Sequence, residues 1–164
     1  MNASIAFAAG IISIALVFYT AGVFLERRAG TLRPAHLAFF YAGLACDTVG
    51  TSAMAQLAQG AGANPVHAII GAIALVLMLA HALWATVAVI RRNPASLARF
   101  HRFSVAVWLF WLVPYVCGML MGVPALHMTT GGALATAATV SVGVGGILCL
   151  RTNAAARRNR PQRG

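Results

Sequence analysis

Long apolar runs separated by short polar segments dominate the hydrophobic pattern of this chain. Each run is close to the length of about 20 residues that an α-helix needs to cross the hydrocarbon core of a bilayer. None shows the strict alternation of a half-buried strand. The pattern predicts an all-α integral membrane protein, an up-and-down four-helix transmembrane bundle followed by a fifth C-terminal transmembrane helix. The runs are residues 3–25, 35–55, 66–90, 103–122 and 131–150.

The segments between the runs divide the chain into three parts. The first run has its charges after it rather than before it, which indicates a retained helix and not a signal peptide. Pro34 suits the start of the second helix. We expect a four-helix transmembrane core over residues 1–122, a fifth transmembrane helix over 123–151 and a disordered basic cytoplasmic tail over 152–164.

Composition supports a fold built in lipid. The chain has 164 residues, of which 60% are hydrophobic and 9% charged, whereas soluble domains carry about 25% charged residues. The three cysteines, Cys46, Cys117 and Cys149, stand singly in different runs without a pairing motif. We therefore expect them to be small buried hydrophobic residues.

The net charge of +10 comes from arginines that cluster at the ends of the runs. The positive-inside rule places such clusters in the cytoplasm, where they also meet anionic headgroups, and it places the uncharged loops outside. The N-terminus is then outside and the C-terminus cytoplasmic. No aromatic residues interleave with the basic ones, so nucleic-acid binding is disfavoured. The clusters are Arg27, Arg28 and Arg33; Arg91, Arg92, Arg99 and Arg102; and Arg151, Arg157, Arg158, Arg160 and Arg163.

Asp47 is one of only two acidic residues in the chain, and it falls near the middle of the second run. An ionisable group at that depth is costly and by default suggests a function, with a partner in the bundle interior. The alternative is a neutral Asp47 that bonds Thr48, Thr51 or a neighbouring helix. Both interpretations stay open at this point.

His36 and His101 each lie just inside a helix that follows an arginine-bearing loop, and so at similar depth. A bis-imidazole haem needs two such ligands on facing helices, and this pair therefore predicts a haem b site. Arg33, Arg99 and Arg102 are close enough in sequence to bind the haem propionates. The alternative is that both histidines are only interfacial residues at helix ends.

His67 and His81 share one face of the third helix at a separation of about 21 Å. Di-haem membrane cytochromes use nearly this spacing, although a core histidine bonded to a hydroxyl gives the same pattern. By depth, His81 is also the nearest polar partner of Asp47, and such a pair would relay protons or bind a quinone headgroup. His127, in an outside loop, could approach His67 only if the fifth helix packs close to the third.

The fourth run presents a stripe of bulky and polar side chains at helical spacing. This stripe could flank a porphyrin or a quinone. Its alternative and commoner role is core packing or an interfacial belt. The stripe consists of Ser104, Trp108, Trp111, Tyr115 and Met119.

Several short motifs, taken in order, resemble the HsmA-like family of small bacterial membrane proteins. The resemblance covers residues 1–122 and implies a four-helix bundle in the bacterial cytoplasmic membrane, without implying an established reaction. The fifth helix and the basic tail depart from the family. The matching stretches are Tyr19-Thr20 to Glu26, Leu32 to His36, Asp47-Thr48-x-Gly50-Thr51, His67 with Gly71, His81-x-x-Trp84-Ala85 and Phe100-His101-x-Phe103-Ser104.

Three functions remain open from the sequence. The preferred one is electron transfer in the membrane through haem b or a quinone, which would make the protein an oxidoreductase-type cytochrome. The second is a small proton-coupled transporter or export protein, and the third is a structural subunit of a membrane complex. Besides lipid, the expected partners are a membrane redox protein or further copies of the chain. No hydrolase, kinase or dinucleotide motif occurs in the sequence.

Overall fold

The computed structural model describes residues 3–59, 65–91, 94–122 and 128–158, and within these it is all-helical. The predicted helical fold class is confirmed in this part of the chain. The helices are α1 (Ala3–Ala29), α2 (Pro34–Ala58), α3 (Pro65–Arg91), α4 (Pro94–Gly122) and α5 (Thr130–Arg158). Each helix extends beyond the apolar run that predicted it, α4 by nine residues at its start and α5 by eight residues at its end.

Proline and glycine mark several of the helix ends. Pro34, Pro65 and Pro94 are the first residues of α2, α3 and α4, positions where a missing N–H leaves no helical hydrogen bond unmade. Gly30 follows α1 with a φ of 63°, the left-handed conformation with which many helices stop. The turn from α1 to α2 is therefore set by local sequence.

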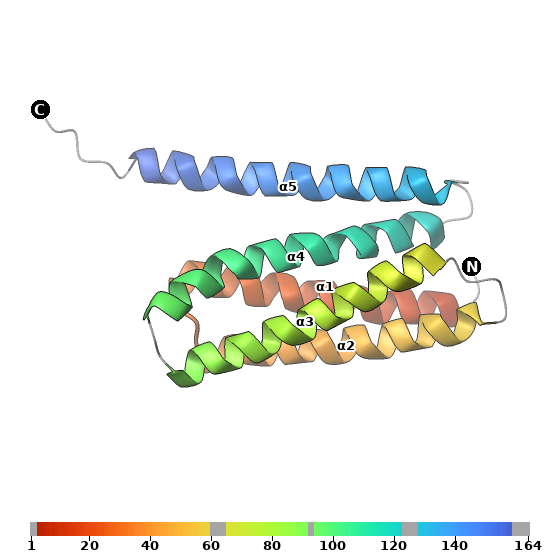
Figure 1. Ribbon diagram of the computed structural model, residues 1–164, viewed down its shortest axis with the longest axis horizontal. Coiled ribbons are helices and arrows are strands. Elements are labelled where there is room, and N and C mark those ends of the chain that lie inside the picture. The colour runs from red at the N-terminus through yellow and green to blue at the C-terminus, as the bar shows by residue number, and fades with distance from the viewer. Residues whose placement is uncertain (1–2, 60–64, 92–93, 123–127, 159–164) are drawn as a thin grey trace, which may run out of the picture.

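The first four helices pack around a common interior, called here the α1–α4 core. In it α1 contacts α2 and α4, α2 contacts α3, and α3 contacts α4. The long helix α5 lies along α4 on the outside of this core (Figure 1). The polar residues buried inside the core therefore come from four helices that are distant in sequence.

Glycines allow α1 and α2 to approach closely. A Cβ added at Gly22 would lie 2.7 Å from Cε1 of Phe40, and one added at Gly43 would lie 2.5 Å from Cδ1 of Tyr19. Small residues at such interfaces are the usual means by which membrane helices come into contact. The ring of Tyr19 is thereby held between α1 and α2.

Four helices in the described residues are long and apolar enough to cross a membrane: Ala3–Ala29, Ala68–Arg91, Phe103–Met121 and Thr130–Thr152. The chain is thus a multi-pass membrane protein. Large apolar side chains on the outer surface fit this assignment, among them Val17 at 66% exposed and Val142 at 75%, since lipid is the solvent there. The remaining helix, α2, does not belong to this set; it carries the buried Asp47 and several hydroxyl residues, of which Thr48 and Ser52 are exposed.

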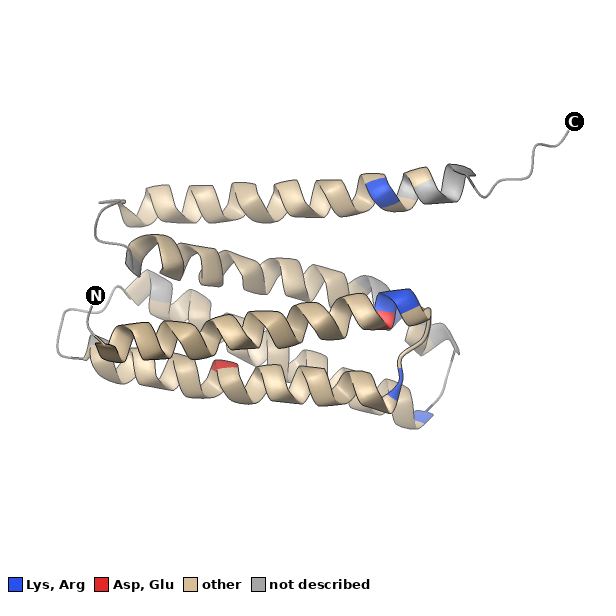
Figure 2. Cartoon of the chain, turned by 180° about the vertical axis from the view of Figure 1, so that it is seen from behind, with Lys and Arg blue, Asp and Glu red and all other residues tan. Residues whose placement is uncertain are grey.

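The arginines of the described residues gather at one end of the molecule, where α1 and α3 end, α2 and α4 begin and α5 nears its C-terminal end (Figure 2). This end of the molecule is called the arginine end, and the opposite one the uncharged end. Arg27 also donates a 2.6 Å hydrogen bond to the hydroxyl of Thr152, which ties α5 to α1 at the arginine end. The segregation of charge follows the pattern predicted from the sequence.

The cysteines fit the sequence prediction only in part. Cys117 is buried and Cys46 half-buried, but Cys149 is exposed. The prediction of a buried residue is wrong for Cys149, because α5 packs mainly against α4 and leaves most of its circumference uncovered.

Candidate functional site

One face of α4 supplies a row of polar side chains to the α1–α4 core. Four of its residues recur at alternating spacings of about three and four, which keeps them on one side of a helix. Each carries a polar atom that bonds to another helix of the core, so this face is called the α4 stripe. Its members are Ser104, Trp108, Trp111 and Tyr115.

Asp47 is a buried ionisable side chain of this interior with three hydrogen-bond partners, and it is 4% exposed. The indole Nε1–H of Trp111 donates a 2.7 Å hydrogen bond to Oδ2. The hydroxyl of Tyr19 donates to the same oxygen at 3.4 Å, and that of Thr51 donates to Oδ1 at 3.3 Å. Asp47 has no cationic partner among the described residues. Donors from α1, α2 and α4 thus converge on one carboxyl group.

The bond from Thr51 is one that the sequence suggested for a structural Asp47, together with bonds to a neighbouring helix. Thr48, the other hydroxyl proposed for that role, donates instead to the carbonyl of Leu44 at 2.7 Å. The hydrogen bonds of Asp47 therefore run mainly between helices, and they fix α2 against α1 and α4.

Aromatic rings continue outward from Asp47 toward the uncharged end. The rings of Tyr19 and Trp111 meet edge to face with centroids 5.1 Å apart, and those of Trp111 and Tyr115 stack at 5.5 Å with an interplanar angle of 20°. The hydroxyl of Tyr115 then lies 3.1 Å from Oγ of Ser13. This aromatic row, Tyr19–Trp111–Tyr115, surrounds one side of the carboxyl.

His81 lies at a different level of the α4 stripe, nearer the arginine end, and is fully buried. Its Nε2 is 3.1 Å from Oγ of Ser104, while its Nδ1 is buried and has no hydrogen-bond partner among the described residues. The imidazole stacks on Phe100 with centroids 5.0 Å apart and meets Phe40 at 4.8 Å. His81 is therefore a buried histidine bonded to a hydroxyl, as the alternative interpretation had it.

The expected pair of Asp47 with His81 does not form. Ser104 and Trp111, which bond the two groups, stand two turns apart on α4, a separation of about 10 Å along the helix. Each ionisable side chain consequently has its own partner from α4. Depth alone had suggested the pair, but the two side chains bond to different levels of the stripe.

His36 caps the start of α2. The backbone N–H of Arg33 donates a 3.1 Å hydrogen bond to its Nδ1, and the N–H of His36 donates to the carbonyl of Arg33 at 2.9 Å. A neutral imidazole that accepts at Nδ1 carries its proton on Nε2. A ligating histidine normally donates from the nitrogen that does not bind the metal. In this arrangement the ring does not fit the role of haem ligand.

Several of the residues proposed for haem binding cannot be placed. The side chains of His67, His101 and Arg102, and the segment with His127, lie outside the described residues. The facing pair of His36 and His101 is thus untested. Arg33 and Arg99 are exposed, as headgroup-binding or propionate-binding residues would be.

Sequence reasoning missed the contribution of α1. Ser13, Tyr19 and Thr20 each bond a member of the α4 stripe or Asp47, and Glu26 is buried at 2% exposed. Polar residues inside an otherwise apolar run were the available signal. It was overlooked because hydroxyl residues in membrane helices usually bond to their own backbone.

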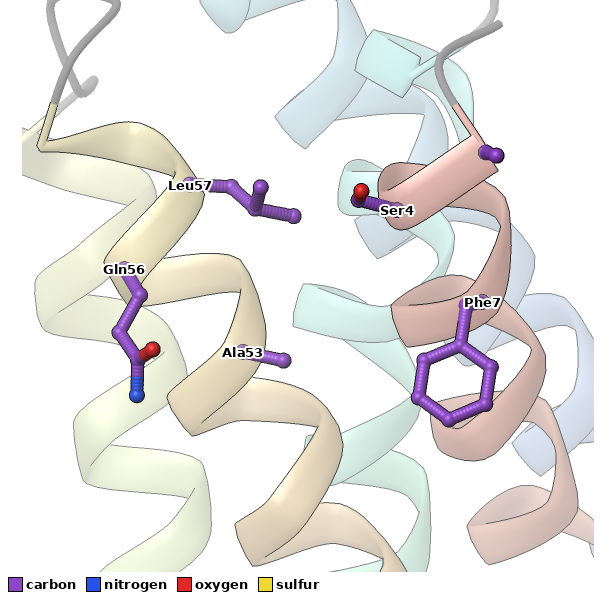
Figure 3. A pocket seen from close by; sticks show the side chains of 6 residues that line it. Ser4, Phe7, Ala53, Gln56 and Leu57 are labelled. Carbon is purple, nitrogen blue, oxygen red and sulfur yellow. The ribbon is translucent and has the colours of Figure 1, made fainter.

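An open groove lies between α1 and α2 at the uncharged end (Figure 3). Phe7 and Leu57 give it apolar walls, and Ser4 and Gln56 add two polar groups. Gln56 is about 14 Å from Asp47 along α2. The groove thus opens on the same helix pair that holds the buried carboxyl.

Comparisons of the chain with protein-family models, with curated proteins and with solved structures give no match.

Proposed function

We propose that the chain spans the bacterial cytoplasmic membrane, with α1–α4 as an up-and-down bundle and α5 as a further spanning helix. The arginine end is then cytoplasmic, as is the C-terminus, and the N-terminus is outside. The charge segregation of the described residues supports this orientation. The HsmA-like motifs in residues 1–122 support the choice of membrane.

Within this membrane protein, Asp47 is proposed to take up and release protons during quinone-linked electron transfer. One observation carries the proposal, namely a carboxyl group buried in the core, without a cationic partner in the described part of the chain, and bonded directly to the oxidisable side chain of Trp111. Quinone reduction consumes protons as well as electrons, so an enzyme that performs it inside a bilayer needs a proton-bearing group there. Asp47 provides that group.

The groove at the uncharged end is the proposed entry for the quinone. Its apolar walls suit an isoprenoid tail, and Gln56 and Ser4 can bond the carbonyl oxygens of the headgroup. Ligand sites are commonly apolar with a few placed polar groups, and this groove has that composition. His81 is a second proton-handling residue in the proposal, further along α4.

Haem b remains a separate part of the proposal. It would use His36 and His101 as ligands, with Arg33, Arg99 and Arg102 at the propionates and His67 or His81 at a second site. Haem binding at His36 requires its ring to leave the hydrogen bond with Arg33. Absorbance of the protein purified from haem-replete cells tests it: a Soret band lost in both His36→Ala and His101→Ala supports haem, and a colourless preparation rejects it.

A proton-coupled transporter is the second candidate. The observation in its favour is the bond between Ser13 and Tyr115, which extends the polar interior from the level of Trp111 toward the uncharged end. A structural subunit is the third candidate, favoured by the large uncovered surface of α5. Neither requires a redox partner.

Reconstitution separates these candidates. The protein is placed in liposomes that contain a quinol, and quinol oxidation by external ferricyanide is followed together with proton release. We expect Asp47→Asn to lower the protein-dependent rate at least tenfold. Thr139→Val is the matched control, because Thr139 is exposed on α5 and, in the described part of the chain, bonds only to the carbonyl of Ala135 in its own helix.

The outcomes differ for each function. A rate no higher than that of protein-free liposomes rejects quinone-linked electron transfer. Flux driven by a pH gradient that is lost in Asp47→Asn, without quinol oxidation, supports the transporter instead. Activity in neither assay, with unchanged folding of both variants, leaves the structural role.

A further inference from the structure

Trp111 has chemical surroundings that the neighbouring tryptophan of the stripe lacks. Its Nε1–H points at a carboxyl oxygen 2.7 Å away, whereas Nε1–H of Trp108 donates to the hydroxyl of Thr20 at 3.1 Å. Both indoles are nearly buried, at 3% and 6% exposed. The two residues thus differ mainly in the group that accepts the indole proton.

That difference matters when an indole loses an electron. The resulting radical cation is a far stronger acid than the neutral indole, and it gives up its N–H proton to a base within hydrogen-bond reach. A carboxylate is such a base, and a threonine hydroxyl is not. The indole Nε1–H of Trp111 can only donate, so Oδ2 of Asp47 accepts this hydrogen bond and is the atom that the indole proton would reach.

We propose that Trp111 is a redox-active residue and Asp47 its proton acceptor. One electron leaves the indole for a one-electron oxidant dissolved in the bilayer that is strong enough to oxidise an indole, of the lipid peroxyl radical class, which becomes a hydroperoxide anion. The Nε1–H bond breaks and the proton moves to Oδ2 of Asp47, which gives a neutral indolyl radical and a carboxylic acid. A hydroquinone-class donor returns the electron, and the proton returns from Asp47 to Nε1.

The rings on both sides of Trp111 give the electron a route. Tyr19 lies at 5.1 Å and Tyr115 at 5.5 Å between centroids, and Tyr19 also directs its hydroxyl at Oδ2, at the longer distance of 3.4 Å. The shorter bond makes Trp111 the first site of proton-coupled oxidation. This inference rests on the proposed function in taking Asp47 as the proton-bearing group.

Flash photolysis tests the inference without a natural partner. The full chain is placed in nanodiscs with an alkylated ruthenium photo-oxidant and an electron-accepting quencher, and transient absorption distinguishes the neutral indolyl radical from the indole radical cation. In the wild type we expect the neutral radical. Trp111→Phe should lower its yield at least fivefold, and the matched control Trp108→Phe should leave it unchanged.

Substitutions of Asp47 test the proton transfer itself. Asp47→Asn keeps a hydrogen-bond acceptor but removes the base, so the radical cation should persist at least tenfold longer than in the wild type. Asp47→Glu restores a carboxylate and should restore the neutral radical. Circular dichroism and size-exclusion chromatography of the nanodiscs verify that each variant is folded. If Asp47→Asn does not fold, the rate of indole deprotonation in Asp47→Glu is compared with that in the wild type.

Two results would overturn the assignment. One is a neutral radical of wild-type yield in Trp111→Phe, and the other is deprotonation in Asp47→Asn as fast as in the wild type. Photolysis does not involve a quinol, so failure here is distinct from failure of the liposome assay. A neutral radical without quinol oxidation rejects the proposed quinone function and keeps the redox role of Trp111.

Discussion

Ser104 and Trp111 bond two different ionisable side chains from the same face of α4. Oγ of Ser104 lies 3.1 Å from Nε2 of His81, and Nε1 of Trp111 lies 2.7 Å from Oδ2 of Asp47. Because one helix holds both groups, α4 sets the distance between them. The two sites can nevertheless be perturbed separately, since each has its own partner.

Loss of the Trp111 bond should destabilise the protein more than loss of the Trp108 bond. Hydrogen bonds to charged groups contribute about 1.5–3 kcal/mol, and neutral ones about 1 kcal/mol. We therefore expect Trp111→Phe to lower the free energy of unfolding in detergent by about 1 kcal/mol more than Trp108→Phe does. Equal losses for the two variants would contradict a special role for the bond to Asp47.

The pairing of His81 with Ser104 predicts a coupling between their substitutions. Ser104→Ala leaves both ring nitrogens of His81 without a partner and should cost about 1–3 kcal/mol. In a His81→Phe background the same change should cost little, because the imidazole is gone and Phe fits among Phe40 and Phe100. The four variants form a double-mutant cycle in thermal unfolding. Additive effects would show that the bond contributes nothing.

Alanine substitutions of glycines should lower stability where two helices are in close contact and should not lower it at open positions. A Cβ at Gly43 would lie 2.5 Å from the ring of Tyr19, so Gly43→Ala should destabilise the protein by about 1–3 kcal/mol. Nothing lies within 4 Å of a Cβ at Gly143 on α5, so Gly143→Ala should be neutral or stabilise by up to about 1 kcal/mol. Thermal unfolding in detergent measures both, and equal effects would rule out the close approach of α1 and α2.

The helices were predictable from sequence because long apolar runs and terminal prolines are local signals. Pro34, for example, marks the start of α2 as expected. The helix that contains Asp47 was harder to recognise as membrane-spanning, because its polar residues make it less apolar than the other helices. The exposure of Cys149 was missed because it depends on what covers α5, which no local pattern records.

The sequence identified the ionisable residues of the candidate site that are costly to bury in a membrane, but it did not identify their hydrogen-bond partners. Asp47 and His81 stood out in the sequence because a titratable group inside an apolar run is rare. Their hydrogen bonds to Trp111 and Ser104 could not be foreseen, because helix rotation and register decide which residues meet. Depth along the membrane gave no information about rotation, and the predicted pair of Asp47 with His81 failed for that reason.

Thiol labelling tests the proposed orientation. In a variant with its three cysteines replaced by alanine, Ser4→Cys lies at the uncharged end and Arg28→Cys at the arginine end, and both positions are exposed. A membrane-impermeant maleimide added to intact cells should label the first variant and reach the second only after permeabilisation. The reverse result would place the arginine end outside and contradict the positive-inside assignment.

Infrared difference spectroscopy tests the central claim that Asp47 carries the proton. The chain has only two acidic residues, Asp47 and Glu26, so a carboxylic C=O band that changes when a bound quinone is reduced has only two side-chain sources. We predict a band that disappears in Asp47→Asn and persists in Glu26→Gln. A band that is unchanged in Asp47→Asn, or no carboxyl band in the wild-type difference spectrum, would contradict proton uptake by Asp47.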